Sequence, residues 1–302
     1  MRASRWLVLV ATGALAGCAG PLAVDFGSAS LGTSADGAIR HPAQLPFEGD
    51  GYAVPELWRG RRANYGTEEL VEAVVRASRA VRREYGAGTA AIGDLSRRSG
   101  GGSSQHRSHH NGRDVDIFYY AANEHGAPVP LTDAMLHFAP DGRAVRWSPP
   151  QGVRPPSRPV PACQFDARRN WAFVRALLSD PEVEVQWIFM QRNLAAALLA
   201  QAAAQGDDPA LVARAAFIIR QPTDSEPHDD HMHVRLYCSP DDRRLGCADR
   251  GPVRWWKKMW KYMGPPFGRL PVDRLGPADL EALGRLLTGE PPLDLIGSPL
   301  SS

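Results

Sequence analysis

The chain has 302 residues, of which 43% are hydrophobic and 23% are charged. This balance supports a packed core and excludes wholesale disorder. The formal net charge is +2, and setting aside Arg2 and Arg5 leaves 33 basic against 33 acidic residues. We therefore expect no nucleic-acid partner, since such a partner normally needs a clustered basic face. The sequence contains no run of the roughly 18 apolar residues that a membrane-spanning helix requires.

The N-terminus has the pattern of an export signal. Arg2 and Arg5 form a basic start, and the apolar run that follows, residues 6–15, is too short to span a membrane. Leu15-Ala16-Gly17-Cys18 resembles the lipobox of bacterial lipoproteins, in which the cysteine is lipidated and becomes the new N-terminus. The resemblance implies a signal peptide over residues 1–17 and a lipid anchor on Cys18. The alternative is an ordinary secretory signal that happens to contain a cysteine.

The surroundings of Cys18 also indicate where the protein would reside. Ala19 rather than Asp follows the cysteine, which by the same resemblance favours the outer membrane and a periplasmic location. The lipid would then be the only contact with a membrane. Residues 18–56 are rich in Gly, Ser, Ala and Pro without a sustained period, and we expect a tether there.

Export places the remaining cysteines in an oxidising compartment. Cys238 and Cys247 are close in sequence and could form a disulfide, whereas Cys163 could be free or could compete for either of them. The spacing alone leaves these pairings open.

Residues 57–248 contain both helical and strand-like periods, without a strict alternation, and predict an α+β domain. Thr67 is expected to cap a helix that ends near Gly86, and Asp166 and Asn193 to cap two more; a further helix is expected over residues 211–220. Alternation predicts strands at the following segments: residues 90–95, 113–120, 183–189 and 231–237. The Pro- and Gly-rich residues 125–162 are expected to form a long loop that shapes a cleft.

The last segment, residues 249–302, is expected to be a C-terminal extension. It contains a cluster of Trp and Lys residues between positions 255 and 262. This cluster could contact a membrane or polymer surface, but we favour packing against the domain with the lysine heads in water. One short helix is expected over residues 277–288.

Six of the nine histidines fall in two clusters, one over residues 106–116 and the other over residues 228–235. On a strand, His231 and His233 share one face and Met232 and Val234 share the other. In the first cluster Asp114 and Asp116 share a polar face, and Gly112 allows a turn back towards His109. If the two strands pair, two imidazoles and a carboxylate meet, which is a common catalytic zinc set. The alternative is a wet sheet face of ordinary polar residues.

The paired motifs Ser108-His109-x-x-Gly112-x-Asp114-Val115-Asp116 and His231-Met232-His233-Val234-Arg235-Leu236 resemble the penicillin-insensitive murein endopeptidases. Residues 93–96, 100–102 and 170–171, with His106 and Cys238, also fit that family's pattern, so the resemblance covers roughly residues 60–248. This group is related to lysostaphin-type peptidases, D-Ala-D-Ala peptidases and the hedgehog domain. It implies a small antiparallel sheet that carries a zinc site and is flanked by helices.

The resemblance also implies roles for individual residues. His109, Asp116 and His233 would bind one zinc ion per chain, and His231 and His228 would activate water and stabilise the oxyanion. His106 would add a secondary metal contact, and Asp114 would orient a ligand or form a salt bridge. His110, His125 and His137 are expected at the surface.

The implied substrate is peptidoglycan, cut at its peptide crosslink, with D-Ala–meso-diaminopimelate as the expected bond. Two other functions remain open from the residues themselves. One is a cysteine peptidase built on Cys163. The other is a non-catalytic cell-wall-binding lipoprotein that keeps the fold. A serine acyl-enzyme is disfavoured because the sequence lacks Gly-x-Ser-x-Gly and Ser-x-x-Lys.

Overall fold

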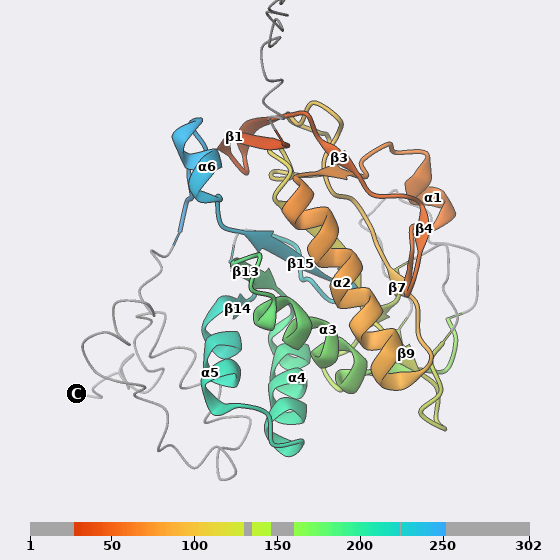
Figure 1. Ribbon diagram of the computed structural model, residues 1–302. Helices are drawn as coiled ribbons and strands as arrows, with labels where there is room; N and C mark the ends of the chain where they lie inside the picture. Colours follow the sequence, from red (N-terminus) through yellow and green to blue (C-terminus); the bar gives the residue numbers. More distant parts are fainter. Residues whose placement is uncertain (1–26, 130–134, 146–159, 224, 252–302) are drawn as a thin grey trace, which may run out of the picture.

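A four-stranded sheet lies at the centre of the computed structural model, which describes residues 27–129, 135–145, 160–223 and 225–251 (Figure 1). Its order is β14-β13-β15-β8, formed by Ile219–Arg220, Val185–Phe189, His231–Leu236 and Asp114–Phe118. The pairs β13–β15 and β15–β8 are antiparallel, while β13–β14 is parallel. The predicted α+β fold with a largely antiparallel sheet is therefore confirmed.

Helices α2 (Glu68–Tyr85) and α3 (Ala167–Ser179) pack against each other, and α4 (Arg192–Ala204) and α5 (Pro209–Ile218) continue this layer (Figure 1). The predicted limits of α2 are confirmed: the Thr67 hydroxyl accepts a hydrogen bond from the Leu70 amide, and Gly86 ends the helix in a left-handed conformation. The Asp166 cap of α3 is also confirmed. The Asn193 cap is wrong, because α4 begins one residue earlier with Gln191 at the cap position.

Shorter elements surround this core. The remaining helices are α1 (Glu56–Arg59) and α6 (Pro240–Arg244). The remaining strands are β1 (Ala29–Thr33), β2 (Asp36–Arg40), β3 (Ala43–Gln44), β4 (Glu48–Gly49), β5 (Tyr52–Ala53), β6 (Tyr65–Gly66), β7 (Ala90–Ala91), β9 (Ala121–Ala122), β10 (His137–Phe138), β11 (Ala144–Val145) and β12 (Gln164–Phe165).

The expected tether over residues 18–56 is wrong where the structure describes it. β1 and β2 form an antiparallel hairpin, and β1 lies beside α6 (Figure 1). The buried Ser30 amide donates to the Asp242 carboxylate at 2.9 Å, which ties the hairpin to the far end of the chain. The pairs β3–β6 and β5–β7 join the next residues to the domain. Short strands carry almost no periodic signal, so composition alone suggested a linker.

The C-terminal end of the domain also extends beyond residue 248. A disulfide joins Cys238 to Cys247, one of the pairings that the sequence left open, and Cys163 is free and buried. Asp249 accepts hydrogen bonds from the Arg113 guanidinium at 2.9 Å and the Cys238 amide at 2.8 Å. The rest of the predicted extension, the lipobox and the export signal lie outside the described residues. Among those that are described, no helix is long and apolar enough to cross a membrane.

Candidate metal centre

Strands β8 and β15 bring the two histidine clusters together, as the alternation predicted. They pair antiparallel, with Asp116 opposite His233 and Asp114 opposite Arg235. Between these positions Val115 and Val234 are fully buried in the core beneath the sheet. The core side chains therefore fix the register, because a slip of one residue would turn the polar residues into the apolar interior.

His109 reaches the same place from the loop that precedes β8. Its backbone is left-handed (φ 69°), which is unusual for a residue other than glycine. The Ser96 hydroxyl donates to its carbonyl at 2.5 Å and accepts from the Gly112 amide at 3.0 Å, so this turn is held from both sides. Gly112 is also left-handed, and an added Cβ there would lie 2.6 Å from the Ile39 side chain. For a residue other than glycine, such as His109, a left-handed backbone costs about 1–3 kcal/mol, and such strain is typical of functional sites.

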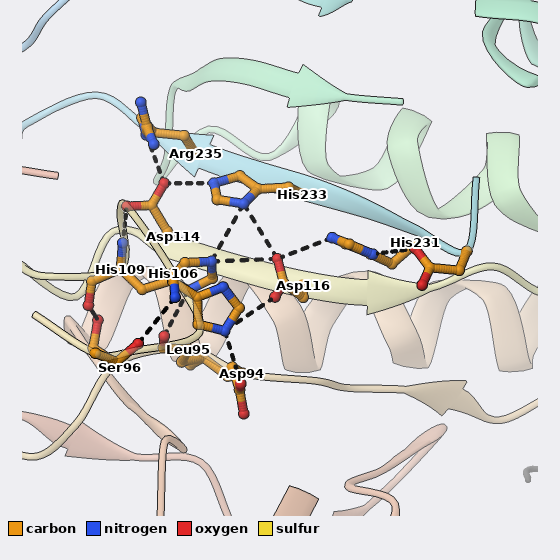
Figure 2. Close-up of polar contacts among 12 residues, drawn as sticks. Asp94, Leu95, Ser96, His106, His109, Asp114, Asp116, His231, His233 and Arg235 are labelled. Carbon is orange, nitrogen blue, oxygen red and sulfur yellow. Dashed lines mark hydrogen bonds and ion pairs between the residues drawn. The ribbon is translucent and has the colours of Figure 1, made fainter. Parts of the chain in front are cut away.

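Three donor atoms converge at this point (Figure 2). The Nε2 atom of His109 lies 3.3 Å from Nδ1 of His233 and 3.3 Å from Oδ1 of Asp116. The third edge, from His233 Nδ1 to Asp116 Oδ1, is 3.2 Å. All three side chains are at most 7% exposed. The predicted meeting of two imidazoles and a carboxylate is therefore present, with nearly equal sides.

The partners of the two imidazoles decide where their protons lie. The other nitrogen of His109, Nδ1, lies 2.6 Å from the Leu95 carbonyl, and that of His233, Nε2, lies 2.8 Å from the Asp114 carboxylate. A carbonyl and a carboxylate accept hydrogen bonds, so these nitrogens are assigned as N–H donors. In the neutral rings the converging nitrogens then carry lone pairs, and they face Asp116 Oδ1, a buried oxygen with no hydrogen-bond partner. Lone pairs that meet without a proton are suited to a cation.

Electrostatics keep both aspartates ionised. Burial raises the pKa of Asp116, but the neighbouring His109 and His231 outweigh it and hold the pKa well below its ordinary value. Burial also raises the pKa of Asp114, but Arg235 and His233 outweigh this effect, so the pKa of Asp114 lies below its ordinary value. Arg235 Nε donates to the same Asp114 oxygen that His233 contacts, at 2.5 Å. Asp114 therefore orients His233 and also forms the salt bridge, so both of its expected roles are present.

His106 lies beside this set. With His109 and Asp116 it forms a second group of donors within 4.8 Å of one another. Its Nε2, however, lies 2.8 Å from the Asp94 carboxylate and 3.9 Å from the second oxygen of Asp116. Arg61 donates to the same Asp94 oxygen at 2.7 Å. His106 Nε2 therefore lies closer to Asp94 than to Asp116, and the group that contains His233 is the more compact of the two.

His231 lies beside Asp116, and His228 lies beside both His231 and His233. Nε2 of His231 points to Asp116 Oδ1 at 3.6 Å, and its Nδ1 lies 2.6 Å from the Asp230 carboxylate (Figure 2). The His228 and His231 ring centroids are 5.1 Å apart, and Nδ1 of His228 is buried without a hydrogen-bond partner. Both predicted catalytic histidines therefore lie next to residues of the three-donor group.

The two rings differ in protonation. Burial lowers the pKa of His231, but the Asp116 and Asp230 carboxylates outweigh it and raise the pKa to about 9. Burial, together with the neighbouring His231 and His233, lowers the pKa of His228 to about 4. One neutral and one protonated imidazole side by side are the kind of pair that performs acid and base chemistry.

The expectation that His137 is an ordinary surface residue is wrong. Its ring is 17% exposed and lies between Asp229, whose Oδ1 is 2.9 Å from Nδ1, and Asp230, whose Oδ2 is 3.5 Å from Nε2. His137, Asp229 and Asp230 form a group, separate from the one that contains His106, that could also hold a metal ion. Sequence reasoning missed it because His137 lies in the Pro- and Gly-rich segment, where no period indicates which way a side chain points. By contrast, the side chain of His125 is 81% exposed, as expected.

The fold and the site define a class: α+β proteins in which paired strands and a preceding loop present a candidate metal centre beside two further histidines. The chain belongs to the penicillin-insensitive murein endopeptidase family, whose model matches residues 30–255. It is 28% identical over 229 residues to the penicillin-insensitive murein endopeptidase of Salmonella paratyphi A, covering 73% of this chain and 70% of the relative. The enzyme of the same name from Escherichia coli O1:K1 / APEC is 28% identical over 233 residues, with the same coverage. The resemblance seen in the sequence motifs is confirmed, and the match includes β2 and all of β1 except Ala29.

Proposed function

We propose that the protein is a zinc-dependent endopeptidase that cleaves the peptide crosslinks of peptidoglycan. The observation that carries this proposal is the triangle of His109, Asp116 and His233, in which three lone pairs meet at 3.2–3.3 Å. Family membership supports the substrate, since the matching family and the relatives carry the name murein endopeptidase.

The donor set suits zinc. Zinc binds histidine nitrogen at about 2.0–2.1 Å and carboxylate oxygen at about 2.0–2.2 Å in tetrahedral geometry, which separates neighbouring donors by about 3.3 Å. The three distances between the donor atoms, 3.2–3.3 Å, agree with that separation. Three protein donors also leave one position for water or substrate, as in catalytic zinc sites. A bound zinc ion would polarise the substrate carbonyl and lower the pKa of water.

The chain's own residues would supply the rest of the chemistry. The Leu95 carbonyl and the Asp114 carboxylate hold the two ligand rings in the tautomers that direct lone pairs inward. His231 and His228 lie beside the donors, where they would take the proton of the attacking water and stabilise the oxyanion of the tetrahedral adduct. This proposal includes no acyl-enzyme, so β-lactams would find no nucleophile to trap.

We further propose D-Ala–meso-diaminopimelate as the bond, and the periplasm as the location. Residues 1–17 would direct export, and lipidation of Cys18 would anchor the protein, with Ala19 favouring the outer membrane. These proposals rest on the sequence pattern and on a substrate that lies in the cell wall. The Cys163 alternative is disfavoured because Cys163 is buried in the core, and burial raises the pKa of its thiol, which opposes formation of the nucleophilic thiolate.

The test is a muropeptide digest. The full chain, solubilised in mild detergent, is incubated with purified crosslinked muropeptide dimers, with and without a chelator, and the products are separated by chromatography. We expect dimers to be converted to monomers, the chelator to stop the reaction, and added zinc to restore it. Zinc bound with dimers unchanged would indicate a cell-wall-binding protein instead. Inhibition by thiol alkylation without inhibition by the chelator would favour the cysteine alternative.

A further inference from the structure

A chain of side-chain contacts leads from the candidate metal centre to His137 on β10. His231, whose Nε2 points to Asp116, is held at Nδ1 by Asp230 Oδ1 at 2.6 Å. The other oxygen of Asp230 faces His137 Nε2 at 3.5 Å, and His137 Nδ1 contacts Asp229 Oδ1 at 2.9 Å. The order is therefore His231, Asp230, His137, Asp229, with carboxylates and imidazoles alternating.

The backbone holds this chain in place. The Phe138 amide donates to the Asp229 carbonyl at 2.9 Å, so β10 is joined to the turn that precedes β15. Phe138 is buried and packs against Tyr119 with ring centroids 6.0 Å apart. The Tyr119 hydroxyl in turn donates to the His228 carbonyl at 2.8 Å. The position of His137 relative to the two catalytic histidines is thus fixed by the core.

Asp230 connects the two histidines, because one of its oxygens faces His231 and the other faces His137. A carboxylate that serves one imidazole with each oxygen cannot rotate without breaking a contact, so both partners restrict the direction in which it holds His231. The two contacts differ in strength: 2.6 Å to His231 is a short charge-assisted hydrogen bond, while 3.5 Å to His137 is mainly electrostatic. Burial raises the pKa of Asp230, but His231 and His137 outweigh it and lower the pKa, which keeps this carboxyl ionised.

We propose that His137 is a positioning residue for catalysis, acting through Asp230 to orient the imidazole of His231, with Asp229 holding His137 in turn. The proposal rests on the proposed peptidase function and deepens it, because it makes the segment around β10 part of the catalytic centre. Its effect is on turnover. Neither His137 nor Asp229 supplies one of the three donor atoms, so we expect substitutions at His137 to leave metal binding unaffected.

A merely structural role for His137 would be to anchor β10 through Asp229. Two substitutions separate the roles, because each keeps one of the two nitrogen donors. In His137→Gln the side-chain amide nitrogen takes the place of Nε2 and faces Asp230. In His137→Asn it takes the place of Nδ1 and faces Asp229. Positioning needs the first contact and anchoring needs the second.

The experiment compares His137→Ala, His137→Gln and His137→Asn in the full chain, with His125→Ala as the matched control from an exposed position. Zinc content, kcat and KM for cleavage of a muropeptide dimer are measured. We expect His137→Ala to lower kcat about tenfold, within the usual range for residues that orient a catalytic group, with KM within about twofold of wild type and zinc retained. His137→Gln should recover most of the lost kcat, and His137→Asn should resemble His137→Ala.

Recovery in His137→Asn but not in His137→Gln would overturn the proposal in favour of anchoring, as would an unchanged kcat in all three variants. Long-range proton–nitrogen spectra of the imidazoles provide a readout independent of turnover. They should show a shifted Nδ1–H proton resonance of His231, from a weaker hydrogen bond to Asp230, in His137→Ala and His137→Asn but not in His137→Gln; an unaltered resonance in all three contradicts positioning. If the wild-type protein itself leaves dimers uncleaved, the proposed function fails, while these spectra still test His137.

Discussion

The two clusters of histidine and aspartate on either side of His231 have similar compositions but opposite proton arrangements. In the first, His109, His233 and Asp116 turn two bare nitrogens and an unpartnered oxygen towards one point. In the second, each ring nitrogen of His137 faces a different carboxylate, Asp229 or Asp230. The donor atoms of the first cluster lie 3.2–3.3 Å apart, and those of the second are also close enough to hold a metal ion.

The difference teaches that donor spacing alone does not identify a metal site. An imidazole that faces a carboxylate at both ring nitrogens can hold a proton at each of them, and it then has no lone pair to offer a metal ion. A neutral imidazole that donates from one nitrogen has a lone pair at the other. On this ground we propose the cation in the first cluster and a positioning role for the second.

The largest effect should come from the ligands of the first cluster. His233→Ala removes one of the three donor atoms and leaves Asp114 without that partner, so we expect bound zinc and dimer cleavage to be lost together. His109→Ala should behave in the same way. Metal analysis of the purified variants beside His125→Ala checks this. Normal zinc content in His233→Ala would show that the ligand assignment is wrong.

His231→Ala should separate metal binding from turnover. His231 lies 3.6 Å from Asp116 but is not one of the three donors, so we expect zinc to be retained at the wild-type level while cleavage is lost. The same muropeptide digest, run alongside metal analysis, measures both. Substantial cleavage by this variant would remove His231 from the catalytic role.

A smaller effect is expected from Asp114→Asn. The amide keeps an oxygen near His233 but loses the negative charge that pairs with Arg235. Replacing such a partner of a metal-binding histidine typically weakens metal affinity 10–100-fold. Competition against a chelator of known affinity measures the shift. Asp141→Asn, which changes an exposed aspartate paired with Arg143, is the matched control and should retain wild-type affinity.

The smallest effect on metal content should come from the second cluster. Asp229→Asn removes a carboxylate that would be a ligand if His137, Asp229 and Asp230 held a cation. We expect one zinc per chain before and after the substitution. A wild-type stoichiometry of two that falls to one in Asp229→Asn would instead make the second cluster a metal site.

Much of the candidate site could be predicted from the sequence because its residues lie on strands. Strand alternation placed Asp116 and His233 on polar faces, and the core residues between them made pairing in this register favourable. The α2 helix was equally clear, since its cap, period and terminal glycine agree. These signals are local, so a single sequence contains them.

The remaining features depend on contacts between distant segments. The Leu95 carbonyl that sets the tautomer of His109 is a backbone atom, which no residue type indicates. The hairpin of β1 and β2 has a low-complexity composition, and its tie to Asp242 spans most of the chain. His137 lies in a segment without periodicity. Tertiary packing decides each of these features.

X-ray absorption spectroscopy of the zinc-loaded full chain at the zinc edge tests the central claim most directly. The three-donor site predicts two imidazole nitrogens and carboxylate oxygen at about 2.0–2.2 Å, with no sulfur. His106→Ala should leave this spectrum unchanged, while His233→Ala should remove the bound zinc. A spectrum with three imidazoles that loses one in His106→Ala would contradict the account.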